Sequence, residues 1–186
     1  TLELALRSAL ETDQFHLVYQ PIVNARSRAV TGFEALCRWT HPQLGPIPPS
    51  RFIPIAEDTR LISKLGHWVL ETACQAACHW PEDVSISVNI SAEQLDDPDI
   101  IEKVAEALSR SGLPANRLEL EVTESVFMRE GTGAAQALEQ LTRRGIRLSL
   151  DDFGTGYSSL GYLSRTRFNT IKVDRSFVTG AARGQR

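Results

Sequence analysis

Short apolar runs alternate with longer runs of helical spacing along most of the 186 residues. The apolar runs are rich in β-branched residues and are bounded by polar or glycine-rich stretches, which is typical of strands. The six predicted strands are residues 15–23, 29–39, 84–91, 117–125, 146–154 and 169–177. Strands that alternate with helices usually pair in parallel, with each helix crossing over one face of the sheet. We therefore predict one α/β domain over residues 1–186.

The intervening runs predict helices and one loop. The helical runs are residues 1–14, 53–80, 92–112, 133–145 and a short one at 157–165. Asp58 or Thr59 is placed to cap the second helix, and Pro81 lies just past its end. We expect the third helix to be interrupted near Pro98 and closed by Gly112, and residues 41–52 to form a proline-rich loop.

Composition narrows the class of protein. The chain is 42% apolar and 23% charged, as in ordinary globular domains, and its net charge of −3 lacks the basic excess of DNA- or RNA-binding proteins. No apolar run approaches the roughly 20 residues of a transmembrane helix. Three sparse cysteines favour free thiols in a reducing compartment over a disulfide framework. We expect a cytoplasmic domain, and the sequence leaves open whether a parent protein is attached to a membrane.

Oxygen-bearing side chains gather at the ends of consecutive predicted strands. Glu34, Asn89, Glu121 and the pair Asp151–Asp152 come from four strands in chain order. Sites in parallel α/β folds form where the carboxyl ends of strands meet. Hard cations such as Mg²⁺ or Mn²⁺ prefer oxygen ligands of this kind. The pattern predicts a metal site, and two adjacent carboxylates can serve two ions about 3.5–4 Å apart, as in phosphodiester hydrolysis.

The adjacent aspartates require a bend. Successive strand side chains point to opposite faces, so Asp151 and Asp152 reach one site only where the chain departs from a regular strand. We expect residues 153–156, which contain two glycines, to supply that bend. Lys172, in the sixth strand, is placed to hold a phosphate oxygen or to orient a metal-bound water.

Each of these residues also has a simpler interpretation. A single acidic residue at a strand end is more often a helix cap or a solvated loop group, so only the joint pattern favours a metal site. Glu119 shares a strand face with Glu121 by alternation, and we expect it to be an inner structural carboxylate instead of a ligand. Glu124 is expected to support the glycine-rich loop.

Seven motifs in order give the chain a resemblance to a known family. They are LVYQPIV, GFEALCRW, FIPIAED, SVNIS, LELEVTES, LSLDDFGTGYSSL and IKVDRSFV. Together they resemble the EAL domain, which hydrolyses the bacterial second messenger cyclic di-GMP. The resemblance runs from near residue 1 to about residue 178.

The resemblance implies a fold and an activity. The fold is a (β/α)₈ TIM-like barrel whose first strand runs antiparallel to the rest. The activity is hydrolysis of cyclic di-GMP to pGpG with two divalent ions, Mg²⁺ or Mn²⁺. The resemblance also implies a homodimer, and sensor or cyclase-like domains elsewhere in a parent protein.

The resemblance assigns roles to the same side chains. The implied metal ligands are Glu34, Asn89, Glu121, Asp151 and Asp152. Glu34, Asp151 and Lys172 match catalytic positions, with Lys172 near the attacking water. Gln20, Leu36 and Arg38 match positions that bind the bases and phosphate of the substrate, and Glu124 matches the glutamate that braces the DDFGTG loop.

One departure concerns the end of the chain. The family pattern continues past DRSFV into two more strands, which carry a further glutamate and a glutamine, and neither precedes Arg186. The domain is therefore predicted to be C-terminally incomplete and to lack its last two strands. Three interpretations follow: a longer natural domain, a truncated inactive fold, or a site completed by a second chain.

Three functions remain open from the sequence. The first is an active phosphodiesterase, although this chain alone is expected to have low turnover. The second is a cyclic di-GMP binding or regulatory module without turnover. The third is a scaffold that binds no nucleotide, against which the polar strand ends argue, because buried carboxylates destabilise a fold that has no use for them.

Overall fold

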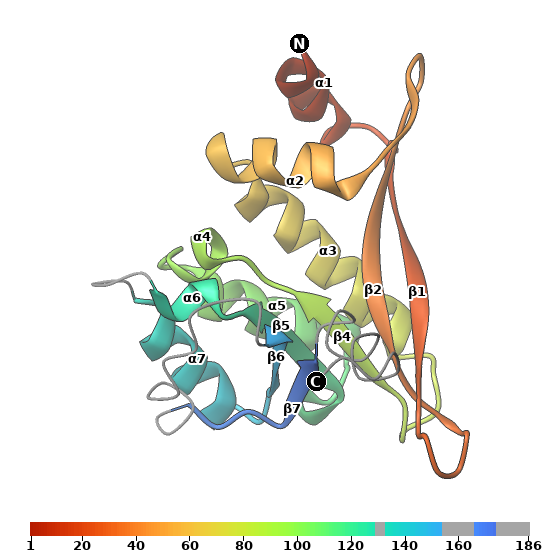
Figure 1. Ribbon diagram of the computed structural model, residues 1–186, viewed down its shortest axis with the longest axis vertical. Helices are drawn as coiled ribbons and strands as arrows, with labels where there is room; N and C mark the ends of the chain where they lie inside the picture. Colours follow the sequence, from red (N-terminus) through yellow and green to blue (C-terminus); the bar gives the residue numbers. More distant parts are fainter. Residues whose placement is uncertain (129–132, 154–165, 174–186) are drawn as a thin grey trace, which may run out of the picture.

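One sheet organises the structure, a computed structural model that describes residues 1–128, 133–153 and 166–173 (Figure 1). The strands follow the order β1-β2-β4-β5-β6-β7, and β3 pairs with β2 beside this path. Their bounds are Phe15–Val23 (β1), Val30–His41 (β2), Gly45–Ile47 (β3), Ser85–Asn89 (β4), Leu118–Thr123 (β5), Arg147–Phe153 (β6) and Thr170–Val173 (β7). All six predicted strands are present, although residues 154 and 174–177 of the last two predictions lie outside the described residues. The seventh strand, β3, lies within residues 41–52, which were predicted to form a proline-rich loop.

Strand direction agrees with the predicted fold. β1 and β3 run antiparallel to β2, whereas β2, β4, β5, β6 and β7 are parallel to their neighbours. In the described part of the chain, this is a TIM-like barrel without its last strands, with an antiparallel first strand. The parallel order brings the carboxyl ends of β2, β4, β5, β6 and β7 to one edge.

The helices connect these strands. They are α1 (Leu2–Ala9), α2 (Pro49–Asp58), α3 (Ile62–Ala77), α4 (Ala92–Leu95), α5 (Ile100–Ser111), α6 (Ser125–Met128) and α7 (Ala134–Arg143), with a short 3₁₀ turn at Ala115–Arg117. The predicted interruption near Pro98 separates α4 from α5, and Gly112 ends α5 in a left-handed conformation at φ +72°. The predicted helix at 157–165 lies outside the described residues. No helix within the described ranges is long and apolar enough to cross a bilayer.

The prediction of one helix over residues 53–80 was wrong, because two helices, α2 and α3, occupy this part of the chain. Pro49 begins α2, since proline has the backbone angle of a first helical residue and needs no hydrogen-bond donor there. The helical conformation is then interrupted between α2 and α3 at Arg60, whose φ is +59°. Neither residue predicted as the cap is the N-cap of a helix, because Asp58 ends α2 and Leu61 precedes α3. The Thr59 hydroxyl donates back to the Ile55 carbonyl at 2.6 Å. Both helices bury the same kind of apolar stripe, so periodicity alone does not reveal the break.

The two faces of the sheet differ in chemistry. One face carries buried aliphatic side chains that form the main core with residues of α3, α5 and α7: Ile86, Val88, Leu118, Leu120, Val122, Leu148 and Leu150. The opposite face carries polar residues at alternate positions: Ser87, Asn89, Glu119, Glu121, Arg147, Ser149, Thr170 and Lys172. A typical (β/α)₈ interior is filled by branched aliphatic residues. In the described strands of this sheet, polar side chains stand on that face instead.

Candidate active site

Four side chains from four strands meet at the carboxyl edge of the sheet. The Lys172 Nζ donates to Glu34 Oε2 at 2.8 Å and to Glu121 Oε2 at 2.6 Å. The Asn89 Nδ2 donates to Glu34 Oε1 at 2.9 Å. We call Glu34, Asn89, Glu121 and Lys172 the polar cluster. Its hydrogen-bonded pairs are 51 to 138 residues apart in the chain, so only the parallel sheet brings them together.

Burial and charge act strongly on this cluster. The Glu121 side chain is fully buried, while the side chains of Glu34 and Lys172 are 17% and 27% exposed. Burial, aided by the negative charges of Glu34 and Asp151, raises the pKa of Glu121 to about 7 despite Lys172. Burial would also raise the pKa of Glu34, but hydrogen bonds from Lys172 and Asn89 outweigh it and lower that pKa.

Lys172 remains a cation in this setting. Burial by itself would lower its pKa, because desolvation disfavours the charged form. Hydrogen bonds to Glu121 and Glu34 more than compensate, so the pKa of Lys172 is raised. The ammonium is therefore a donor at neutral pH and is unsuited to act as a base.

The adjacent aspartates lie at an irregularity of β6. Leu150 pairs with Ile171 and Phe153 with Val173, so Asp151 and Asp152 together stand opposite Lys172 alone. Asp152 has a φ of +54°, which is rare for a residue other than glycine. Two residues opposite one form a β-bulge, which interrupts the strict alternation of side chains. The predicted bend thus lies at the aspartates themselves, and the glycines expected to supply it fall outside the described residues.

The sequence-predicted substrate residues lie beside the cluster. Gln20 pairs with Glu34 across β1 and β2 and is exposed. Leu36 and Arg38 follow Glu34 at alternate positions of β2 and line the same pocket as Asn89 and Glu121. The Arg38 Nη1 donates to the Cys37 carbonyl at 3.0 Å.

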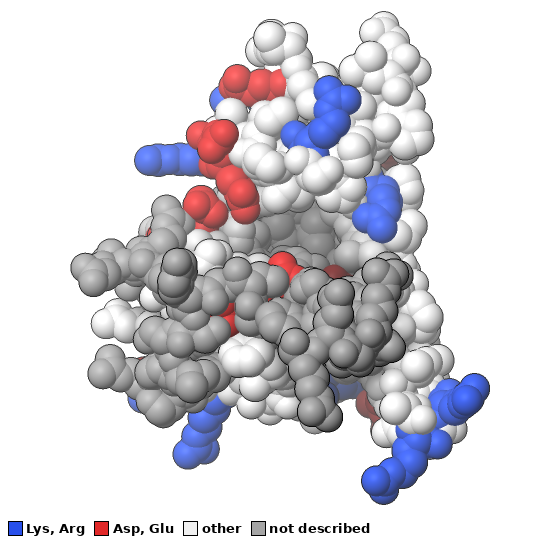
Figure 2. Space-filling model, in the orientation of Figure 1, with Lys and Arg blue, Asp and Glu red and all other residues white. Residues whose placement is uncertain are grey.

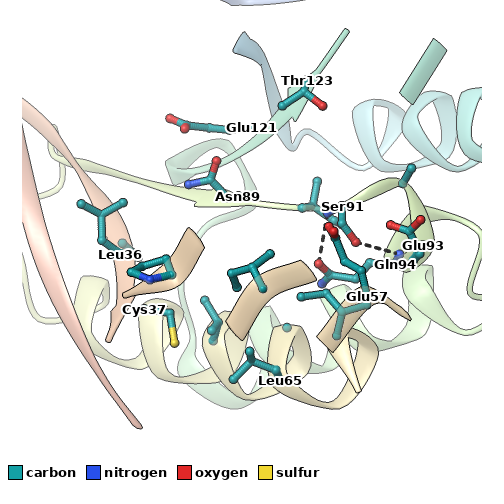
Figure 3. A pocket seen from close by; sticks show the side chains of 18 of the residues that line it. Leu36, Cys37, Glu57, Leu65, Asn89, Ser91, Glu93, Gln94, Glu121 and Thr123 are labelled. Atoms are coloured by element: carbon teal, nitrogen blue, oxygen red, sulfur yellow. Dashed lines mark hydrogen bonds between the residues drawn. The ribbon is translucent and has the colours of Figure 1, made fainter. Parts of the chain in front are cut away.

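The pocket has a volume of about 830 Å³ and lies between β2, α2, α3 and α4. Figure 2 shows it as a hollow near mid-height of the molecule, with acidic atoms in red at its lower edge. In Figure 3, Asn89 and Glu121 lie at the end near Leu36, and Ser91, Glu93 and Gln94 lie at the other end. Aliphatic side chains of α2 and α3 cover its wall: Ile53, Ile62, Leu65 and Val69. The pocket therefore combines an apolar wall with two polar ends.

Sequence reasoning missed the second polar end. Ser91 and Gln94 form a reciprocal capping box at the start of α4, with Gln94 N to Ser91 Oγ at 3.3 Å and Ser91 N to Gln94 Oε1 at 3.1 Å. Ser-x-x-Gln ahead of a short helix is a readable signal for such a cap. Thr123 also lines the pocket, and alternation from Glu119 and Glu121 could have placed it there.

The two remaining glutamates differ in how far the structure tests them. Glu119 is buried and accepts hydrogen bonds from Ser87 Oγ at 3.3 Å and from Thr170 Oγ1 at 2.9 Å. Arg147 Nη2 lies 3.4 Å from its Oε2 atom. These contacts confirm Glu119 as an inner structural carboxylate. Glu124 is buried just after β5, but the loop that it was expected to support is outside the described residues, so its role stays a prediction.

The donor set suits a hard divalent cation. Within residues 1–128, 133–153 and 166–173, no three His, Cys, Asp or Glu side chains form a ready metal site, and Lys172 lies between Glu34 and Glu121. Yet Glu34 and Glu121 share this one ammonium, and the negative charge of Asp151 also acts on Glu121. The buried Glu121 Oε1 also has no hydrogen-bond partner among the described residues. A buried carboxylate oxygen without a donor is unfavourable, so additional positive charge fits here.

Comparisons with known proteins identify the family of the chain. The family model described as "EAL domain" matches residues 3–186. The bifunctional diguanylate cyclase/cyclic di-GMP phosphodiesterase MucR of Pseudomonas aeruginosa is 46% identical over 181 residues, which is 95% of this chain and 26% of MucR. The cyclic di-GMP phosphodiesterase NbdA of the same organism is 43% identical over 191 residues, covering 100% of this chain and 24% of NbdA.

A solved structure gives the same result for the fold. The PaMucR phosphodiesterase in complex with c-di-GMP superposes with a TM-score of 0.91 at 45% identity, over 98% of this chain and 76% of that one. The chain spans only about a quarter of the length of the curated relatives that it matches.

Proposed function

The chain belongs to the EAL domain family, and on that premise we propose that it is a metal-dependent phosphodiesterase that hydrolyses cyclic di-GMP to pGpG. The observation that carries the proposal is the polar cluster, which lies at the edge of an 830 Å³ pocket. MucR and NbdA, which match nearly all of this chain, are described as acting on cyclic di-GMP.

Five residues would hold the ions: Glu34, Asn89, Glu121, Asp151 and Asp152. When bound, two Mg²⁺ or Mn²⁺ ions neutralise the charge of the phosphodiester and lower the pKa of a bound water. The orphaned Oε1 of Glu121 and the excess of carboxylates over ammonium groups support this assignment.

In this scheme, Lys172 holds the carboxylates of Glu34 and Glu121 in place and orients a water or a phosphate oxygen. Its raised pKa keeps it protonated, so it donates to the carboxylates of Glu34 and Glu121 and fixes their positions. The same ammonium is placed to donate to the attacking water or to a phosphate oxygen. Asp151, next to the cluster on β6, would hold an ion at the same edge.

The pocket walls bind the substrate. Arg38 presents a planar guanidinium that pairs with phosphate oxygens through two parallel hydrogen bonds. Leu36 supplies apolar contact to a base, and Gln20 supplies an amide next to Glu34. Water is excluded from the base by the aliphatic wall from α2 and α3.

The test is turnover. Purified protein is incubated with cyclic di-GMP and Mg²⁺ or Mn²⁺, and the nucleotides are separated to detect pGpG. We expect product that disappears with EDTA and with Glu34→Ala. Glu139→Ala is the matched control, because Glu139 lies on the surface of α7 in an ion pair with Arg143. Product formed equally by Glu34→Ala would contradict the proposal.

A second candidate is a cyclic di-GMP binding or regulatory module without turnover. One observation favours it: Lys172 occupies the space between the two glutamates, and the described residues form no ready metal site. Nucleotide binding that persists in EDTA without any pGpG would select this function.

Further properties are proposed with the activity. We propose a homodimer, accompanying sensor or cyclase-like domains in a parent protein, and a cytoplasmic location. The free thiols of Cys37, Cys74 and Cys78 support a reducing compartment. The combined cyclase and phosphodiesterase description of MucR supports further domains. Light scattering of the purified protein measures the oligomeric state directly.

A further inference from the structure

We propose that Glu119 is a positioning residue, whose carboxylate sets the spacing of the polar cluster from one step deeper in the barrel interior. The inference rests on the proposed function, because it concerns the same site. Glu119 is 6% exposed and lies two residues before Glu121 on the same face of β5.

The partners of Glu119 repeat the pattern of the cluster. Ser87 donates to its Oε1 at 3.3 Å and precedes Asn89 by two residues on β4. Thr170 donates to its Oε2 at 2.9 Å and precedes Lys172 by two residues on β7. Residues two apart on a strand share a face, so each bond to Glu119 lies directly beneath a cluster member.

The bond to Thr170 is the informative one. β5 and β7 are not neighbours, because β6 lies between them. The Glu119–Thr170 bond therefore passes over β6, as the Glu121–Lys172 bond does. At this point β6 carries Ser149, a small and fully buried residue that pairs with both Glu121 and Thr170.

A side-chain hydrogen bond between two non-adjacent strands restricts the curvature of the sheet, which backbone hydrogen bonds restrict less. Ladder bonds join adjacent strands but tolerate a range of twist between them. A side-chain bond between the first and third of three strands fixes their curvature. The Glu119–Thr170 bond thus sets how far Lys172 on β7 lies from Glu121 on β5.

The ion pair of Glu119 with Arg147 helps to distinguish a positioning role from a role in core packing alone. Glu119 has Arg147 at 3.4 Å, and the Arg147 side chain is 40% exposed. Buried ion pairs often stabilise a fold no better than apolar residues of the same size. The presence of a carboxylate at position 119 is therefore better explained by the strand positions that its hydrogen bonds fix than by a gain in stability.

The test uses Thr170→Val, which removes the hydroxyl and keeps a β-branched strand residue. Thr31→Val is the matched control: Thr31 lies on β2, is exposed, and donates to the Ile22 carbonyl away from the site. For Thr170→Val we expect kcat to fall about tenfold, as for a small misplacement of reacting groups. KM should stay within about twofold, because the substrate contacts of β2 are untouched. Thr31→Val should match the wild type in both.

Structure determination of the variants separates this inference from the proposed function. If the wild type gives no pGpG, the proposed function fails, but the variant structures still test Glu119. In Thr170→Val we expect Lys172 Nζ to lose its hydrogen bond to Glu34 or to Glu121. Retention of both bonds, or an unchanged kcat in an active wild-type background, would overturn the inference.

Glu119→Gln provides a second variant if Thr170→Val does not fold. It preserves side-chain size but removes the charge that faces Arg147 and one of the two acceptor oxygens. The same loss of kcat with unchanged KM is expected. Failure of both variants to fold would assign Glu119 to stability alone and would overturn a positioning role.

Discussion

The two faces of strand β5 show how this domain separates stability from chemistry. On one face, Leu118, Leu120 and Val122 are each fully buried in the aliphatic core under the helices. On the other, Glu119 and Glu121 are almost equally buried and accept hydrogen bonds from Thr170 and Lys172. The side chains of both faces are buried to nearly the same extent. Burial of the aliphatic side chains is favourable by itself, whereas burial of the carboxylates requires compensating positive charge. We therefore expect the apolar face to determine stability and the polar face to carry the proposed activity.

The largest contrast is expected from Glu121→Gln. This change removes a carboxylate that has Lys172 as its partner and that lies among other negative charges. We expect turnover of cyclic di-GMP to fall about 10³-fold, as when a group that stabilises transition-state charge is lost. The melting temperature should stay the same or rise, because a buried charge is removed while Lys172 keeps Glu34. Calorimetry and a product assay on one preparation measure both, and a large drop in melting temperature would contradict this division of roles.

The adjacent residue should behave in the opposite way. Leu120→Ala empties space in the core, and we expect a loss of about 2–5 kcal/mol in the free energy of unfolding. The kcat of the folded fraction should stay near that of the wild type, because Leu120 points away from the cluster. Urea titration and kinetics at a temperature well below the transition provide the two values. If kcat fell as far as in Glu121→Gln, the two faces would not be independent.

The dependence of stability on pH should also reveal the buried carboxylate of the polar face. The pKa of Glu121 is raised to about 7, so the folded state binds a proton there more tightly than the unfolded state does. The stabilisation from that proton is fully present below the ordinary glutamate pKa and is lost as the pH rises to about 7 and above. In EDTA, we expect stability to decline across this window in the wild type more than in Glu121→Gln. Identical pH profiles of the two proteins would show that Glu121 is not protonated preferentially in the folded state.

The smallest effect concerns the thiols. Burial raises the pKa of Cys37 and of Cys74 to about 12, so neither forms an appreciable thiolate at neutral pH. We expect both to resist iodoacetamide at pH 7.5 in the folded protein and to react after denaturation. Peptide mass spectrometry identifies the labelled positions. Rapid labelling of Cys74 in native protein would indicate that the apolar face opens easily.

The arrangement of the polar cluster could be predicted from the sequence, because strand alternation is a local rule. The sequence pattern places Glu34, Asn89, Glu121 and Lys172 at strand ends, and the parallel sheet brings them into contact. The double carboxylate at Asp151 and Asp152 likewise indicates a bend from the sequence alone, because a regular strand would turn the two side chains to opposite faces.

The parts that escaped prediction depend on geometry that no local pattern encodes. The bond from Glu119 to Thr170 spans 51 residues and exists only because the sheet curves across β6. The break at Arg60 separates two helices that share one apolar pattern. The short strand β3 forms through pairing with β2, although its glycine and its proline favour a loop.

The most direct test is a side-by-side measurement of pGpG from cyclic di-GMP and Mn²⁺ with wild type, Glu121→Gln and Leu120→Ala. The account predicts product from the wild type and from folded Leu120→Ala, and almost none from Glu121→Gln, with EDTA abolishing all turnover. Equal production by Glu121→Gln and the wild type would contradict the claim that the polar face of the sheet is the catalytic centre.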